Sequence, residues 1–306
     1  MGAIGAAAAA VVVTLLWLAA GDGGDGAPVV PPPVARAGLA DVSMYRGLGS
    51  WVDIYDHRAW ADPVATMEDM RTHGVRTLYL QTSNFGHGRP FVYPYVVPRF
   101  IEAAHAAGLE VVAWYLPGLV DERLDYVRIR AAVELRTPAG QRFDSFALDI
   151  ESPAVRDPAK RTARLVELSA RLRESVGVHY PLGAIVPSPL AMKANPDYWP
   201  GFPWSELHET YDVFLPMTYF TWRVKGRDGA RDYTAGAVKL LRKQTNDPSV
   251  PVHVIGGISG QATTDETWGF VRAVQEEVVM GASYYGFPGT TEAQWKVLSR
   301  AWPNPP

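Results

Sequence analysis

The stretch RFDSFALDIES, residues 142–152, decides how the rest of the chain is interpreted. Its apolar centre predicts a short buried strand that ends in two acidic residues. Because side chains two apart on a strand point to the same face, Asp149 and Glu151 should project together, with Ala147 below them. Two carboxylates at the end of an apolar run are costly to bury unless they are paired, hydrogen-bonded or used in chemistry. A strand-end ion pair is the structural alternative, but neighbouring predicted strand ends offer almost no basic residues.

Strand-like and helix-like segments alternate on both sides of this stretch. The other strand-like segments are residues 48–55, 76–81, 110–116, 182–186, 213–219, 252–255 and 282–287. Strands that alternate with helices pair in parallel through right-handed crossovers. Eight such units in about 260 residues predict an α/β protein with a single-domain (β/α)8 fold, the TIM barrel. An open doubly wound sheet is the alternative, but the glycine-rich phosphate loop expected after its first strand is missing.

Several helix ends are marked by residues that satisfy unpaired backbone groups. Asp157 and Pro158 predict the start of a long helix, and Gly177 predicts its end. Thr263 and Glu266 have the spacing of a capping box at the start of a later helix. Pro216 lies inside a predicted strand and should make the backbone there irregular.

Composition restricts the class of protein. The chain has 306 residues, of which 47% are apolar and 20% charged, as expected for a globular protein with a large core. A formal net charge of −3 argues against nucleic-acid binding. The absence of cysteine excludes disulfides and thiolate metal sites, and the seven histidines show no ligand spacing, so a metal site is not expected.

The N-terminal segment has a composition of its own. Residues 3–20 are an uncharged apolar run, and a Gly-, Asp- and Pro-rich stretch follows. We therefore interpret residues 1–21 as a signal peptide or membrane anchor, 22–43 as a linker and 44–306 as the barrel. This division predicts an extracytoplasmic protein, secreted or held at the cell surface through a membrane tether, and we expect a monomer.

Acidic and aromatic residues gather at the predicted carboxyl ends of the strands, which form the working face of a barrel. The candidates are Asp53, Gln81, Trp114, Asp149, Glu151, Met217, Tyr219, Trp222 and Tyr284. Acids can donate protons and stabilise positive charge, and flat aromatic faces stack on sugar rings. The combination suits glycoside hydrolysis, whose transition state resembles an oxocarbenium ion.

The segment DSFALDIE, residues 144–151, resembles the DxxDxDxE signature of the family-eighteen chitinase-like glycoside hydrolases. It matches three of the four acids at identical spacing, and Met217-Thr218-Tyr219 resembles the Met-x-Tyr of that family's sixth strand. The resemblance spans about residues 44–302. It implies a hydrolase that acts on a polysaccharide containing N-acetylhexosamine, such as chitin or peptidoglycan, without a metal or organic cofactor.

The resemblance also implies roles for individual residues. Glu151 would be the general acid on the glycosidic oxygen, and Asp149 would orient the substrate's N-acetyl group, which attacks the anomeric carbon. Tyr219 would hydrogen-bond the same acetamido group. We expect the other strand-end candidates to bind substrate; these are Asp53, Gln81, Trp114, Met217, Trp222 and Tyr284.

The sequence departs from the family pattern at three places. Ala147 replaces the third acid of the signature, and Phe220 replaces the acid that usually follows the tyrosine. The predicted eighth strand lacks the family's tryptophan, so Tyr284 or Phe287 would have to take its place. These departures favour a second interpretation, a non-catalytic barrel that binds glycans.

Two further alternatives stay open. WVDIY, residues 51–55, together with Asp149-x-Glu151, is similar to the family-twenty-five lysozymes, which cleave peptidoglycan. In a hydrolase of another linkage, Asp53 rather than the substrate would supply the second catalytic group. The basic segment 223–231 is either solvated surface or a region that captures an anionic glycan.

Overall fold

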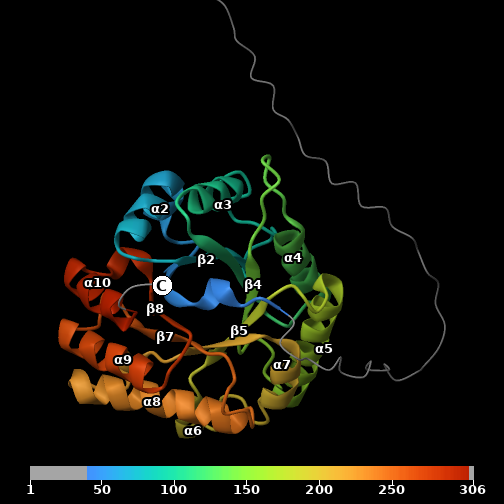
Figure 1. Cartoon of the computed structure of the whole chain (residues 1–306). Helices are drawn as coiled ribbons and strands as arrows, with labels where there is room; N and C mark the ends of the chain where they lie inside the picture. Colours follow the sequence, from blue (N-terminus) through green and yellow to red (C-terminus); the bar gives the residue numbers. More distant parts are fainter. Residues whose placement is uncertain (1–39, 303–306) are drawn as a thin grey trace, which may run out of the picture. The chain divides into compact units, whose positions relative to one another are not determined.

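The computed structural model describes residues 40–302. Eight parallel strands close into a barrel in the order β1 to β8, with β1 hydrogen-bonded to β8. Figure 1 shows the strands at the centre and the helices arranged around them. The predicted TIM barrel is confirmed, whereas the candidate signal peptide or anchor (1–21) and nearly all of the linker (22–43) lie outside the described residues.

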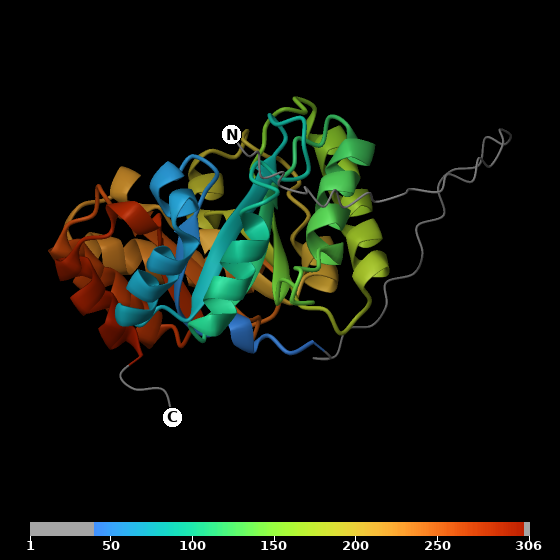
Figure 2. The same ribbon diagram turned by 90° about the horizontal axis from the view of Figure 1, so that it is seen from above.

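The strands are short, and their carboxyl ends meet at one end of the barrel. They are β1 (Gly47–Val52), β2 (Thr77–Asn84), β3 (Glu110–Leu116), β4 (Ser145–Asp149), β5 (Leu182–Pro187), β6 (Val213–Met217), β7 (His253–Ile258) and β8 (Gly281–Tyr285). Figure 2 shows the barrel turned by 90°, with strand β2 running between the helices that cover it.

Ten α-helices connect and cover the strands. They are α1 (His57–Ala61), α2 (Pro63–Thr72), α3 (Val97–Ala106), α4 (Glu122–Glu134), α5 (Pro158–Val176), α6 (Pro189–Ala194), α7 (Trp204–Thr210), α8 (Gly226–Gln244), α9 (Thr264–Glu276) and α10 (Glu292–Leu298) within residues 40–302. The 3₁₀ turns are η1 (Ser43–Tyr45), η2 (Phe220–Trp222), η3 (Phe287–Gly289) and η4 (Ser299–Ala301).

The predicted helix boundaries are confirmed by hydrogen bonds. The Asp157 carboxylate accepts from two backbone N–H groups in the first turn of α5, and Gly177 ends that helix with a φ of 75°. A side chain with a Cβ atom would be strained at such a positive φ. At α9, Thr263 and Glu266 form the complete capping box.

Apolar side chains form two layers, one on the outside and one on the inside of the strand wall. Side chains that point outward pack against the helices, and on β4 these include Phe146 and Leu148. Side chains that point inward fill the barrel, and there Trp51 stacks on Tyr79 with ring centroids 4.2 Å apart. Ala147 lies in the inner layer, so β4 alternates between faces as predicted.

Pro216 disturbs the wall between β6 and β7. The ladder joins these strands at Met217 and Ile255, and an isolated bridge links Phe214 to Val252. Because proline has no N–H to donate, the pairing is interrupted where Pro216 stands. The predicted irregularity is confirmed, and it lies directly before the segment that carries Tyr219.

Candidate active site

Asp149 and Glu151 lie at the carboxyl end of β4. Asp149 is the last residue of the strand and is 6% exposed, whereas Glu151 is partly exposed two residues beyond. The intervening Ile150 donates its backbone N–H to the Ile185 carbonyl at 2.8 Å, which holds this segment against β5. The two acids therefore extend from the strand wall on one side of the chain.

The electrostatic surroundings raise the pKa of both acids. Burial and the adjacent charge of Glu151 raise the pKa of Asp149 well above its usual value, and burial raises the pKa of Glu151. Neither carboxylate forms an ion pair with any residue in the range 40–302, and Asp149 Oδ1 has no hydrogen-bond partner there. The strand-end ion pair, the structural alternative, is therefore not formed.

Two tyrosines from other strands stand near the acids. The Tyr285 hydroxyl donates to Asp53 Oδ2 at 2.9 Å, and the Tyr219 and Tyr285 rings lie 6.2 Å apart. Burial, with contributions from the charges of Asp149 and Glu151, raises the pKa of both phenols. The structure thus brings together predicted residues from β1, β4 and β6, and adds Tyr285 from β8.

Tyr198 supports Glu151 from the loop between α6 and α7. Its hydroxyl donates to the backbone carbonyl of Glu151, and burial raises its pKa to about 12. The guanidinium of Arg161 lies near both Tyr198 and Trp199, 3.9 Å from the Trp199 ring centroid. Nothing in the local sequence pattern distinguishes Tyr198 from the other aromatic residues of this loop.

Three predicted substrate-binding residues are buried at the strand ends. The Gln81 amide oxygen accepts from the backbone N–H of Ile54 at 3.0 Å, so it fixes the segment after β1. The Trp114 indole donates to the Tyr79 carbonyl at 3.3 Å. Met217 packs in the same inner layer, which also contacts Tyr219 and Tyr285. For these residues, contact with substrate stays a prediction.

Trp222 lies on the surface of the 3₁₀ turn after β6. It is 60% exposed, its indole donates to Gln261 Oε1 at 2.8 Å, and its ring meets Tyr219 edge to face at 5.4 Å. Its predicted role in substrate binding stays a prediction, and its open ring is free to stack on a sugar.

Tyr284 is not brought to this site. It is 1% exposed and packs in the outer layer, with its ring 5.1 Å from Phe270 and 6.1 Å from Phe220. Because side chains alternate along β8, Tyr285 occupies the inward position instead. The choice of Tyr284 was therefore wrong by one residue, and Phe220 belongs to the same outer layer.

Exposed aromatic side chains gather at the carboxyl end of the barrel. Among the described residues, the large aromatics with high exposure are Tyr55 (63%), Phe85 (44%), Tyr95 (89%) and Trp222 (60%). All four follow the carboxyl end of a strand, namely β1, β2 or β6. Solvent-exposed rings with no apolar cover are suited to stacking on sugars or other flat ligands.

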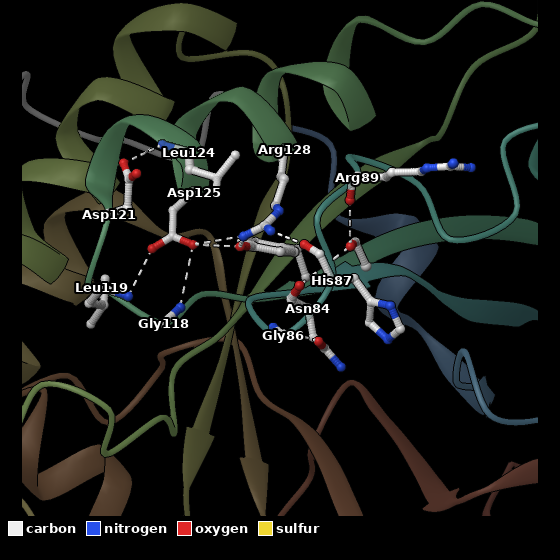
Figure 3. A network of polar contacts seen from close by, with 12 residues as sticks. Asn84, Gly86, His87, Arg89, Gly118, Leu119, Asp121, Leu124, Asp125 and Arg128 are labelled. Atoms are coloured by element: carbon white, nitrogen blue, oxygen red, sulfur yellow. Dashed lines mark hydrogen bonds and ion pairs between the residues drawn. The ribbon is translucent and has the colours of Figure 1, made fainter.

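A buried polar network holds the loops after β2 and β3 (Figure 3). The Tyr115 hydroxyl donates to Asp125 Oδ1 at 2.5 Å and accepts from Arg128 at 2.9 Å. Asp125 also accepts from the backbone N–H of Leu119 at 2.8 Å, and Arg128 donates to the backbone carbonyl of His87. One helix, α4, thereby fixes two loops at the working end of the barrel.

The described residues include neither a metal-binding cluster nor a membrane-spanning helix. Within residues 40–302, no group of three or more histidine or acidic side chains is placed to hold a metal ion. No helix in the same range is long and apolar enough to cross a membrane, and the candidate anchor at residues 3–20 lies outside it.

Comparison with known proteins gives similarity in structure only. No family model and no curated protein matches the chain. The endo-β-1,4-mannanase of Thermotoga petrophila matches with a TM-score of 0.63 at 12% identity, covering 84% of this chain and 76% of its own. The spore cortex-lytic enzyme SleL of Bacillus cereus gives 0.62 at 8% identity, with coverages of 84% and 74%.

Chitin-active enzymes are among the similar structures. A class V chitinase from Pseudomonas fluorescens matches with a TM-score of 0.60 at 12% identity, covering 84% of this chain and 99% of its own. A family 18 N-acetylglucosaminidase from Paenibacillus barengoltzii gives 0.56 at 12% identity, with coverages of 84% and 100%. The resemblance inferred from residues 144–151 is thus matched at the level of fold: the chain shares a (β/α)8 barrel with these enzymes.

Proposed function

We propose that this protein hydrolyses glycosidic bonds in a polysaccharide that contains N-acetylhexosamine, chitin-like or peptidoglycan, with Glu151 as general acid and base. The observation that carries the proposal is the pair of carboxyl groups at the end of β4, buried Asp149 and partly exposed Glu151, which no cation neutralises among the described residues. Such a pair is costly for folding and useful for proton transfer.

The proposed reaction begins with a proton on Glu151. Glu151 donates it to the glycosidic oxygen as the bond to the anomeric carbon breaks, and positive charge develops on the sugar ring. Asp149, whose Oδ1 has no partner, accepts the acetamido N–H, and the acetamido oxygen attacks the anomeric carbon. The Glu151 carboxylate then takes a proton from water, which opens the intermediate with retention of configuration. Tyr219 would hydrogen-bond the acetamido group.

The missing third acid changes how Asp149 is tuned. Below it lies Ala147 in an apolar inner layer with Ile185 and Met217, so burial and the charge of Glu151, rather than a third acid, raise the pKa of Asp149. Asp53 does not take over as a free nucleophile in this proposal. Its two oxygens already accept from the Tyr55 N–H at 2.7 Å and the Tyr285 hydroxyl at 2.9 Å, which suits a residue that positions Tyr285.

The test is a single substitution with a matched control. Glu151→Gln should abolish release of reducing ends from chitin oligomers and purified peptidoglycan while the circular dichroism spectrum is unchanged. Glu174→Gln, which removes an exposed carboxylate from α5, should cleave like the wild type. Equal cleavage by wild type and Glu151→Gln would remove the assignment.

The second candidate is a glycan-binding barrel without catalysis, and Ala147 is the observation that favours it. This candidate expects calorimetric binding of chitin oligomers to the wild type with no cleavage. It also expects Glu151→Gln to bind as the wild type does. Cleavage by the wild type decides against it.

The proposal includes a location outside the cytoplasm, as a secreted monomer or one held at the surface through residues 3–20. The support is the apolar run followed by a Gly- and Pro-rich stretch. Protease added to intact cells should degrade an anchored form, and full protection of the protein would contradict the proposed location.

A further inference from the structure

The loop between β2 and α3 forms an open cavity at the working end of the barrel. The cavity has a volume of about 440 Å³ and is lined by His87, Gly88, Arg89 and Val92. Its position after the carboxyl end of β2 places it beside the segment that follows β1. The Asn84 side chain donates to the Tyr55 hydroxyl at 3.1 Å, and the Tyr55 N–H donates to Asp53 at 2.7 Å.

Arg89 is an exposed cation without an acidic partner. Among residues 40–302 its guanidinium forms no ion pair and no side-chain hydrogen bond. Figure 3 shows the side chain extending away from the network of Asp125 and Arg128. By contrast, Arg227 and Arg231 of the basic segment pair with Asp265 at 2.6 Å and Glu276 at 2.8 Å, respectively.

The backbone around Arg89 is held by buried groups. The Ser83 hydroxyl donates to the Arg89 carbonyl at 2.9 Å, and Arg128, which is 3% exposed, donates to the His87 carbonyl. The Asn84 amide oxygen accepts from the Gly86 N–H at 2.9 Å. Because these bonds already fix the loop backbone, binding would have to order only the Arg89 side chain.

Two exposed aromatic rings belong to the same loop and to the segment that follows β1. Phe85 precedes Arg89 in the same loop and is 44% exposed, and Tyr55 is 63% exposed with its ring 6.4 Å from that of His87. Rings can stack on a sugar while an arginine forms a two-pronged bond with a carboxylate. A neutral polymer would make no use of the charge.

From this arrangement we propose that Arg89 and the cavity beside it bind the carboxylate of an acidic sugar in the polymer. The inference rests on the proposed function and narrows its substrate to a glycan that carries carboxylates. Among the sugars that carry this group are muramic acid, through its lactyl substituent, and the uronic acids, through C6, and the test separates these two.

The experiment measures binding by calorimetry with the full chain carrying Glu151→Gln, so that ligand is not consumed. The probes are a peptide-free tetrasaccharide of alternating N-acetylglucosamine and N-acetylmuramic acid, the same molecule with its carboxyls converted to amides, and tetragalacturonate. We expect about fivefold tighter binding of the acidic tetrasaccharide than of its amide, the size of a partly exposed charge pair.

When Arg89→Gln is added to the Glu151→Gln protein, the preference for the acidic tetrasaccharide over its amide should disappear. Added Arg46→Gln, an exposed arginine just before β1 at the opposite end of the barrel, should keep it. Arg89-dependent binding of tetragalacturonate alone would assign the carboxylate to a uronic acid. The inference would be overturned if the protein bound the acidic tetrasaccharide and its amide equally and did not bind tetragalacturonate. It would also be overturned if Arg89→Gln and Arg46→Gln had equal effects.

Cleavage of a neutral chitin tetramer by the wild type is scored separately. Cleavage without an Arg89-dependent preference overturns this inference alone. Absence of cleavage on every substrate overturns the proposed function, and the binding comparison still decides whether Arg89 recognises a carboxylate.

Discussion

At the scale of single residues, the properties of the site come from where two ordinary carboxylic acids are placed. Asp149 and Glu151 lie at the end of β4, above apolar side chains that fill the barrel. One of these is Ala147, which has no polar group that could share a proton with Asp149. Two neighbouring carboxyls that interact this way titrate as a pair. One proton is therefore held by the pair at a pH at which two solvated acids would have lost both.

This pairing predicts the pH dependence of cleavage. The alkaline limb of kcat/KM should lie above the ~4.3 expected of a solvated glutamic acid, because burial raises the pKa of Glu151 and that of Asp149. In Asp149→Asn the neighbouring charge is gone, so the residual activity should show its alkaline limb at lower pH. A limb at the same pH in wild type and Asp149→Asn would contradict a shared proton.

At this scale the sequence predicted some residues and missed others for clear reasons. Asp149 and Glu151 were recognisable because their spacing and apolar surroundings are local properties. The expected inward position of Tyr284 depended on the register of β8, and a one-residue difference reverses the faces of a strand. Tyr198 reaches Glu151 from a loop 47 residues away in the chain, and no local pattern encodes that contact.

At the scale of elements, α4 connects the packing of the barrel to its working end. Tyr115 on β3 meets Asp125 and Arg128 on α4, and both helical residues are 2–3% exposed. The Tyr115 hydroxyl gives both Asp125 and Arg128 a hydrogen-bond partner, and without it these buried groups would each lose one bond. The loops that carry Leu119 and His87 depend on this network for their backbone hydrogen bonds.

Tyr115→Phe should therefore act on stability and on the loops together. Removing the bridging hydroxyl is expected to cost ~1–3 kcal/mol of unfolding free energy and to speed amide exchange in residues 85–91. Tyr126→Phe, on α4 where it faces Arg171 of α5 and lies outside the network, is the matched control and should change neither. Unchanged exchange in the loop of Tyr115→Phe would show that the network does not hold it.

The elements themselves were largely predictable. Caps such as Thr263 with Glu266, and the Asp157 to Gly177 helix, are set by local hydrogen bonding and appear as expected. No cap or periodic pattern in the sequence predicts the short helices α6 and α7. Their few turns are stabilised by burial of groups such as Trp204 and Leu207, which is a tertiary effect.

At the scale of the whole molecule, closure of the barrel is secured at its amino-terminal end by a neutral histidine. His253 on β7 is fully buried; its Nδ1–H donates to the Tyr45 carbonyl at 2.9 Å, and its Nε2 lies 3.0 Å from the Ser283 hydroxyl of β8. That serine also accepts from the Trp51 indole of β1 at 2.7 Å. The first and last strands are thereby tied through β7.

Burial lowers the pKa of His253 from 6.5 to about 4, so protonation favours the unfolded chain. The stabilising contribution is present above pH 6.5 and is lost as the pH falls toward 4, by ~3 kcal/mol at 1.36 kcal/mol per pKa unit. Urea unfolding at pH 7.5 and 4.0 should show this loss in the wild type, and His253→Gln should lose that much less. Equal losses in the two proteins would contradict a neutral His253.

In the proposed reaction, Glu151 protonates the oxygen of the leaving sugar. The most direct measurement compares kcat/KM of wild type and Glu151→Gln on a chitin oligomer and on a nitrophenyl glycoside of the same sugars. A nitrophenolate leaves without a proton, so we predict a loss of at least ~10²-fold with the sugar leaving group and a far smaller loss with nitrophenolate. Equal losses with both leaving groups would contradict the assignment of Glu151 as the general acid.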